Sequence, residues 1–206
     1  MAQEITHPLV KHHLSILRNK DTSNQQFRHS LRQLTGFVAV EATNELELEQ
    51  YSVETPVQTT TGSRIAQRVG LVPILRAGIG MVEPVLELLP IAEVWHIGLY
   101  RDEETASPVS YYNKLIDGRA VDMAFVLDPM LATGGSACLA CQALTDWGVK
   151  EIKMLSIIAA PEGIEHLGKE FPQVSVYTCA IDEMLNENKF IVPGLGDAGD
   201  RIFNTF

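Results

Sequence analysis

The sequence contains few cysteines, and their spacing supports no cross-linked scaffold. Cys138, Cys141 and Cys179 form an odd set, which argues against a disulfide framework. Cys138 and Cys141 make a CxxC, but no second ligand pair with zinc spacing accompanies them. We therefore expect buried helix cysteines, with redox chemistry or half of a zinc site as the alternative.

Positive charge and long apolar runs are also scarce. Lys and Arg number 16 against 26 Asp and Glu, so the formal net charge is −10, and no basic run offsets it. This balance disfavours nucleic acid as a partner, although local arginines and backbone N–H groups still suit a small anion. The apolar stretches are shorter than the roughly 18 residues of a membrane span, and the N-terminus lacks the features of a signal peptide. We expect a cytoplasmic protein without membrane contact.

The 206 residues, 46% of them hydrophobic, fit one domain that spans residues 1–206. The first 46 residues have helical periodicity, with one stripe at Leu9, Val10, Leu14 and Leu17 and another at Phe27, Leu31, Leu34 and Val38. Ser23 and Gln26 have the spacing of a capping box for the second helix.

From Val69 onward, short apolar runs alternate with helical stretches. The predicted strands are 69–75, 93–100, 121–127, 151–159 and 174–179, and the predicted helices are 79–89, 136–147 and 161–171. This order predicts an α/β fold with a doubly wound, mostly parallel sheet, whose ligands gather beyond the strand carboxyl ends. The polar segment 101–117 is expected to be a long loop or β-arm, and the glycine-rich tail 190–201 to cross the site face, so that together they form a hood.

The most informative segment is DPMLATGGS at 128–136, between a predicted strand and a predicted helix. Unpaired N–H groups and the helix dipole favour an anion at a helix start, and glycines let the backbone approach it closely. Asp128, at the strand end, is placed to accept hydrogen bonds from two sugar hydroxyls. The segment predicts a site for ribose and phosphate, the alternative being a tight turn with a helix cap.

Other phosphate motifs fail on inspection. The sequence has no GxxxxGK[ST], and the GxGxxG match at Gly194, Gly196 and Gly199 follows Pro193 and leaves no room for the acidic residue that a dinucleotide site needs.

DPMLATGGS resembles the signature of the type I phosphoribosyltransferases, and in this form it is similar to that of the uracil phosphoribosyltransferases. The segments PILRAGIGM at 73–81, YRDEET at 100–105 and IVPGLGDAGDR at 191–201 carry the same resemblance, which spans essentially the whole chain. Most of the superfamily has two adjacent acidic residues where this chain has Asp128 and Pro129. The resemblance implies transfer of phosphoribose from 5-phosphoribosyl diphosphate (PRPP) to uracil, which yields UMP and diphosphate in pyrimidine salvage.

The resemblance also implies roles for particular residues. Arg76, Arg101, Asp128 and Asp197 would form the catalytic set, with the two arginines on the diphosphate. PRPP would also contact the segment Asp128, Pro129, Met130, Leu131, Ala132, Thr133, Gly134, Gly135 and Ser136, together with Asp197. Uracil would contact Ile191, Gly196, Asp197 and Ala198, chiefly through the main chain. Phe190 departs from the tyrosine that is more frequent in the family.

Physical alternatives exist for several of these residues. Arg76 could pair with Glu83, Arg101 could be a solvated loop charge, and the tail could be a flexible glycine loop. No all-protein metal site is evident, so Mg²⁺ is expected to arrive with PRPP. No general base for N1 of uracil is identified, although Asp197 is the nearest candidate by position. The histidines are scattered without ligand spacing and are expected to be structural or on the surface rather than catalytic: His7, His12, His13, His29, His96 and His166.

The resemblance further implies a homodimer or higher homo-oligomer and, in some members, allosteric activation by GTP, for which the sequence gives no signature. The alternative from another functional class is a regulatory protein of the same fold that binds PRPP and RNA. The net charge of −10 and the missing basic stripe count against it.

Overall fold

The computed structural model describes residues 1–101, 108–113 and 119–205, and a parallel sheet forms its centre. The sheet has the order β1-β12-β10-β8-β4-β5. Its strands are β1 (Ala2–Glu4), β4 (Val69–Pro73), β5 (Glu93–Val94), β8 (Met123–Leu127), β10 (Glu151–Leu155) and β12 (Ser175–Thr178). The chain runs outward from β4 to β5 and then returns past β4 to β8, so the strand order reverses between β4 and β8. The predicted doubly wound sheet is confirmed, and ligands of such sheets bind at the reversal.

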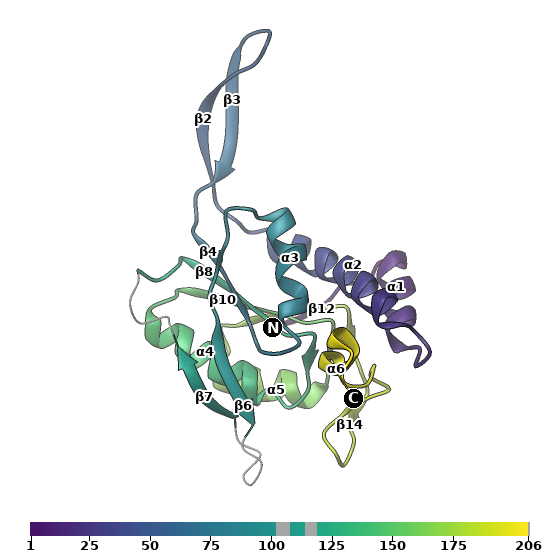
Figure 1. Cartoon of the computed structure of the whole chain (residues 1–206). Helices are drawn as coiled ribbons and strands as arrows, with labels where there is room; N and C mark the ends of the chain where they lie inside the picture. Colours follow the sequence, from purple (N-terminus) through teal and green to yellow (C-terminus); the bar gives the residue numbers. More distant parts are fainter. Residues whose placement is uncertain (102–107, 114–118, 206) are drawn as a thin grey trace.

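Helices cover both faces of this sheet (Figure 1). One face carries α1 (Pro8–Arg18), α2 (Asn24–Ala42) and α3 (Ile79–Leu88), and the other carries α4 (Gly135–Trp147) and α5 (Pro161–Glu170). Because successive side chains of a strand point to opposite faces, β8 contributes Phe125 and Leu127 to the first core but Ala124 and Val126 to the second.

The two predicted N-terminal helices are present, with one exception at the chain start. Phe27, Leu31, Leu34 and Val38 are all at most 1% exposed, and the Ser23 capping box forms. In the first stripe Val10 and Leu17 are buried, but Leu9 is half exposed. The prediction that the whole N-terminal segment is helical was wrong for β1, because its backbone pairs with β12 and extends the sheet.

Two predicted strands are each divided by a bend. The prediction 93–100 contains β5 and then β6 (Ile97–Arg101), because the chain leaves the sheet after Trp95, whose ring packs against Trp147 of α4. The prediction 151–159 contains β10 and β11 (Ile158–Ala159). At this second bend, the carbonyl of Pro129 accepts bonds from both Ile157 and Ile158, which replaces the sheet pairing.

Two hairpins extend from the body. β2 (Leu48–Glu54) and β3 (Thr59–Ile65) form a long antiparallel arm that the sequence analysis left unassigned (Figure 1). β6 pairs with β7 (Pro108–Asn113), which agrees with the β-arm expected within 101–117. The rest of that prediction, 102–107 and 114–118, lies outside the described residues.

The C-terminal tail is more regular than predicted. β13 (Ala180–Ile181) joins β11 and β9 (Met130–Leu131) in a small parallel sheet, and β14 (Met184–Leu185) pairs with β15 (Ile191–Val192). The tail then ends in α6 (Ala198–Phe203). The alternative of a flexible glycine loop was therefore wrong at both ends, because Asp197 caps a helix there and β15 has a strand partner.

The structure places the two cysteines of the CxxC motif in α4. Cys141 is buried and Cys138 half-buried in α4, and burial raises the pKa of the Cys141 thiol to about 12 and that of Cys138 to about 11. A high thiol pKa leaves little reactive thiolate at neutral pH.

Within the part of the chain that the structure describes, no helix has both the length and the apolar content to cross a membrane.

Candidate active site

A cavity of about 350 Å³ lies at the carboxyl ends of β4 and β8, where the strand order reverses. It is lined by Ile74, Leu75, Arg76, Ala77, Asp128, Met130, Ala132, Ser136, Asn188, Lys189, Phe190, Gly196, Asp197, Ala198 and Gly199. Three separate stretches of sequence therefore meet at the place that the fold reserves for ligands.

The ends of β4 and β8 are joined so that Arg76 and Asp128 line the same cavity. The Ile74 N–H donates to the Leu127 carbonyl at 2.9 Å. Gly78 makes this close approach possible, since a Cβ there would lie 2.2 Å from the Leu127 oxygen. Asp128 then receives a hydrogen bond from the Met130 N–H at its own Oδ1, at 3.1 Å, which fixes the carboxylate.

Asp128 has an unusual acid strength. Burial raises its pKa to about 7, and the negative charge of Asp197 adds to the rise, while the Met130 hydrogen bond acts in the opposite direction. A ligand that supplies hydrogen-bond donors or positive charge offsets the free-energy cost of ionising such a buried carboxyl group. Asp128 is thus prepared for a polar, cation-bearing or hydroxyl-bearing ligand.

The turn after Asp128 is held from behind by α5. Gly134 has φ +79° and begins α4 without any side chain to cap it, which leaves the helix N-terminus to an anion. A Cβ on Gly163 would lie 2.4 Å from the Ala132 oxygen, so α5 packs directly on the turn. His166 Nδ1 lies 2.8 Å from the Thr133 carbonyl oxygen, within hydrogen-bond distance.

Arg76 pairs with the C-terminal helix rather than with Glu83, the alternative partner considered from the sequence. Its guanidinium donates to Asp200 Oδ1 at 3.0 Å and to Thr205 Oγ1 at 3.2 Å. Hydrogen bonding from Thr205 and then from Arg76 lowers the pKa of Asp200. Because the Arg76 side chain is 57% exposed, it remains accessible to a second anion.

The tail contributes backbone and one carboxylate to the cavity. Asp197 caps α6 by accepting a bond from the Asp200 N–H at 3.0 Å. Gly194 and Gly196 have φ of +63° and +79°, a region that other residues rarely adopt. The chain before them turns at Asn186, whose Oδ1 accepts bonds from Asn188 and Phe190.

The structure gathers most of the predicted site residues into this cavity. Of the PRPP set, Arg76, Asp128, Met130, Ala132, Ser136 and Asp197 line it, whereas Pro129, Leu131 and Gly134 are buried and Thr133 and Gly135 half-buried in the same turn. Of the uracil set, Gly196, Asp197 and Ala198 line it, and Ile191 is buried in the core. The backbone of Arg101 ends β6, and its side chain lies outside what the structure describes.

Sequence reasoning missed four contributors to the site. Asn188 and Lys189 line the cavity, and Gly163 and His166 support the turn. The Asn-rich stretch 186–188 is typical of a turn and was a usable signal, because asparagine readily forms local hydrogen bonds with the backbone. The positions of Gly163 and His166 depend on how α5 docks, which no local pattern encodes.

Comparisons with known proteins show the family of this chain. The family model described as uracil phosphoribosyltransferase matches residues 4–205. The uracil phosphoribosyltransferase of Roseiflexus sp. strain RS-1 is 55% identical over 199 residues, which cover 97% of this chain and 96% of the relative. The solved AQ2163 protein from Aquifex aeolicus superposes with a TM-score of 0.92 at 35% identity, and 98% of each chain is covered.

A more distant neighbour shares only the fold. The adenine phosphoribosyltransferase of Thermoanaerobacter pseudethanolicus has a TM-score of 0.53 at 10% identity, covering 77% of this chain and 84% of that one, so it shares the fold. The family model and the curated relative place the chain among the phosphoribosyltransferases. Within that class, the chain belongs to the uracil phosphoribosyltransferase family.

Proposed function

We propose that this protein transfers phosphoribose from PRPP to N1 of uracil and releases UMP and diphosphate. The observation that carries the proposal is the single cavity in which Asp128, the uncapped start of α4 and the backbone of 196–198 meet. Sugar, phosphate and base of one nucleotide each find a suitable surface there.

In this proposal the 5′-phosphate binds the N–H groups and hydroxyls of 133–136, at the N-terminus of α4. Anions are favoured there because the helix dipole and the backbone N–H groups at a helix start act together. Ionised Asp128 accepts hydrogen bonds from the ribose hydroxyls, and Arg76 and Arg101 bind the diphosphate. As the bond between the anomeric carbon and diphosphate breaks, the arginines stabilise the departing negative charge.

Uracil would lie against Gly196, Asp197 and Ala198, where backbone groups read its edge. Uracil presents acceptors at O2 and O4 on either side of the donor N3, and cytosine reverses the pattern at N3 and at the C4 substituent. A fixed set of backbone donors and acceptors therefore rejects cytosine by about 10⁴-fold, as fixed polar sites do when a partner is missing. Phe190, 46% exposed at the cavity, offers a ring without the hydroxyl of the tyrosine frequent in the family.

We expect Mg²⁺ to enter with PRPP. Oxygen atoms are the ligands that Mg²⁺ prefers, and the cavity offers the carboxylates of Asp128 and Asp197. The structure describes no cluster of three or more His, Cys, Asp or Glu that could hold a metal without substrate. The ion would supply positive charge beside the leaving diphosphate.

A direct test follows UMP formation from radiolabelled uracil, PRPP and Mg²⁺, with orotate, cytosine, hypoxanthine and xanthine as competitors. We expect turnover with uracil and little inhibition by the other bases. Orotate in particular would need a cation for its carboxylate. Turnover of another base in preference to uracil would contradict the proposal.

The raised pKa of Asp128 predicts that PRPP affinity increases with pH. Because the pKa of Asp128 is about 7, the free protein carries a neutral Asp128 at lower pH. This carboxyl group must then lose a proton before it can accept two hydroxyl hydrogen bonds. The contribution of Asp128 to PRPP affinity should therefore be about tenfold larger at pH 8 than at pH 6. Calorimetric titration of the unmodified chain and of Asp128→Asn measures it, since the ionisation of PRPP itself is common to both.

We also propose a cytoplasmic homodimer, and activation by GTP as in some relatives. The β2–β3 arm supports the dimer: it extends away from the body and exposes Leu48, Tyr51 and Val57, and an isolated two-stranded hairpin is only marginally stable in water (Figure 1). Light scattering should give twice the mass of one chain, and turnover at subsaturating PRPP with and without GTP tests the regulation.

A further inference from the structure

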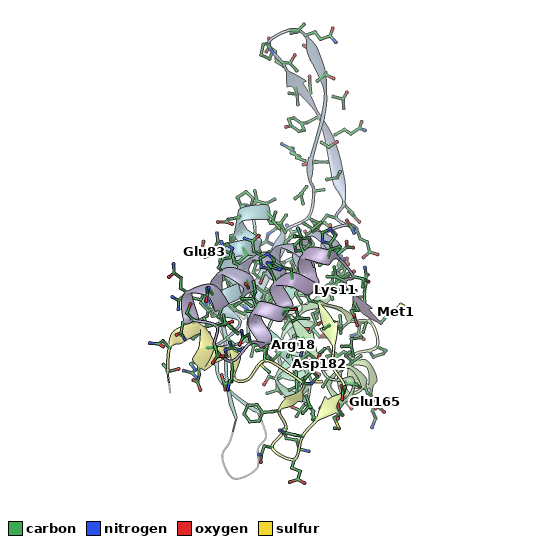
Figure 2. All side chains as sticks on the ribbon, turned by 90° about the vertical axis from the view of Figure 1, so that its right-hand side faces the viewer. Met1, Lys11, Arg18, Glu83, Glu165 and Asp182 are labelled. Carbon is green, nitrogen blue, oxygen red and sulfur yellow. The ribbon has the colours of Figure 1, made fainter. Side chains whose placement is uncertain are left out.

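Arg18 and Asp182 lie side by side, although 164 residues separate them in sequence (Figure 2). Arg18 is the last residue of α1, and Asp182 follows β13. The guanidinium donates through Nη2 to Oδ1 at 2.5 Å and through Nη1 to Oδ2 at 2.8 Å. The Asp182 side chain is only 4% exposed, so this bidentate pair is largely shielded from water.

Both members of the pair also bind the backbone of Gly194. Asp182 Oδ2 accepts a hydrogen bond from the Gly194 N–H at 2.9 Å, and Arg18 Nη1 donates to the Gly194 carbonyl at 3.0 Å. The two peptide units that flank this glycine are therefore fixed from the same side. Hydrogen bonds to charged groups are stronger than those between neutral groups, so Arg18 and Asp182 together hold Gly194 firmly, and we call this pair the clamp.

Gly194 stands two residues before Gly196, in the tail segment that lines the candidate site. A Cβ on Gly194 would lie 2.1 Å from the Ile191 oxygen, so the chain here has one tight path. The next carbonyl, that of Leu195, accepts a bond from Arg201 at 2.7 Å, and Arg201 also donates to Leu17 and Asn19 at the end of α1. The N-terminal helix thus supports two consecutive carbonyls of the tail.

The clamp lies behind the site and not in it. Arg18 lines a second hollow of about 300 Å³, together with Lys20, Gly194 and Gly196. Gly196 lines both this hollow and the candidate site, so the tail is a thin partition between them. A partition open on both sides needs support to keep its N–H and C=O groups in one orientation.

We infer that Arg18 and Asp182 are positioning residues for pyrimidine recognition, which they set through Gly194; this inference rests on the proposed function. A shielded ion pair is weak evidence for stability, because desolvation offsets much of the attraction. Its directional bonds, however, orient the partner to which they attach. The pair therefore fixes which way the backbone of 196–198 faces the base.

The test compares Arg18→Met, Arg18→Lys and the control Arg68→Met. Arg68 is a matched control, because it likewise pairs with a carboxylate, that of Glu93, and donates to backbone carbonyls. It lies at the amino end of β4, away from the candidate site at the carboxyl end. We expect Arg18→Met to raise the KM for uracil about tenfold and to reduce the preference for uracil over cytosine, with the KM for PRPP within about twofold. Arg18→Lys keeps the charge but not the bidentate geometry, so it should restore part of the effect.

Thermal melting separates this role from a purely structural one. A lower melting temperature for Arg18→Met with unchanged KM for uracil and unchanged base preference would overturn the inference, as would an equal rise in both KM values. Arg68→Met should leave all three kinetic quantities as they are. If the unmodified chain forms no UMP, the proposed function fails, and the inference falls with it.

Discussion

Asp128→Asn should reduce kcat/KM for PRPP by about 100-fold or more, because the two charge-assisted hydrogen bonds proposed to the ribose would be weakened together. The local structure should persist, since the asparagine oxygen still accepts the Met130 N–H. Initial rates at varied PRPP and fixed uracil measure the loss.

The same substitution should stabilise the free protein at pH 8. The native pKa of Asp128 is about 7 and its ordinary value 3.8, so the native state holds the proton more tightly than the unfolded state does. The free energy of unfolding therefore falls as pH rises from about 4 through 7. Above pH 7 the ionised carboxylate destabilises the native state by the full amount, and asparagine removes this cost. Thermal melts at pH 5 and 8 should show a clearly larger gain at the higher pH, because only part of the penalty is present at pH 5.

Asp122→Asn is the matched control for both effects. Asp122 immediately precedes β8, where Asp128 immediately follows it, and Asp122 likewise accepts a backbone hydrogen bond, from Arg68. We expect the control to retain full turnover. Full turnover in Asp128→Asn as well would exclude the ribose-binding role and leave the carboxylate as a structural group.

The sequence predicted the parts of the site that local chemistry determines. An apolar strand, an acidic residue and a glycine turn before a helix define where Asp128 and α4 stand, whatever the rest of the chain does. The stripe of Phe27, Leu31, Leu34 and Val38 was equally local, since a helix with one apolar face buries that face.

The parts that sequence reasoning missed depend on contacts between distant segments. Lys153 interrupts an apolar strand, yet it is 2% exposed, because its ammonium donates to the Ala42 carbonyl and pairs with Glu45. The ion pair of Arg18 and Asp182 likewise forms only after α1 and the tail have docked. Period and spacing describe one element at a time, and these residues act between elements.

Gly163 is the clearest case of such a contact with a consequence for activity. Gly163→Ala should raise the KM for PRPP at least tenfold, because the added methyl would stand 2.4 Å from the Ala132 oxygen and 2.8 Å from the Leu131 oxygen, and neither helix nor turn can stay in place. Both oxygens belong to the backbone of the turn, so no side chain can rotate away. Steady-state kinetics with PRPP as the varied substrate measures the effect.

Gly168→Ala separates this contact from the general effect of removing a helix glycine. Both glycines lie in α5, but a Cβ at 168 meets nothing within 4 Å. Gly168→Ala should leave kinetics unchanged and stabilise the protein by up to about 1 kcal/mol, the difference in helix propensity. If Gly163→Ala behaved in the same way, α5 would not support the turn at 128–136. If only Gly163→Ala loses PRPP affinity while both variants remain folded, the position of α5 determines the geometry of that turn.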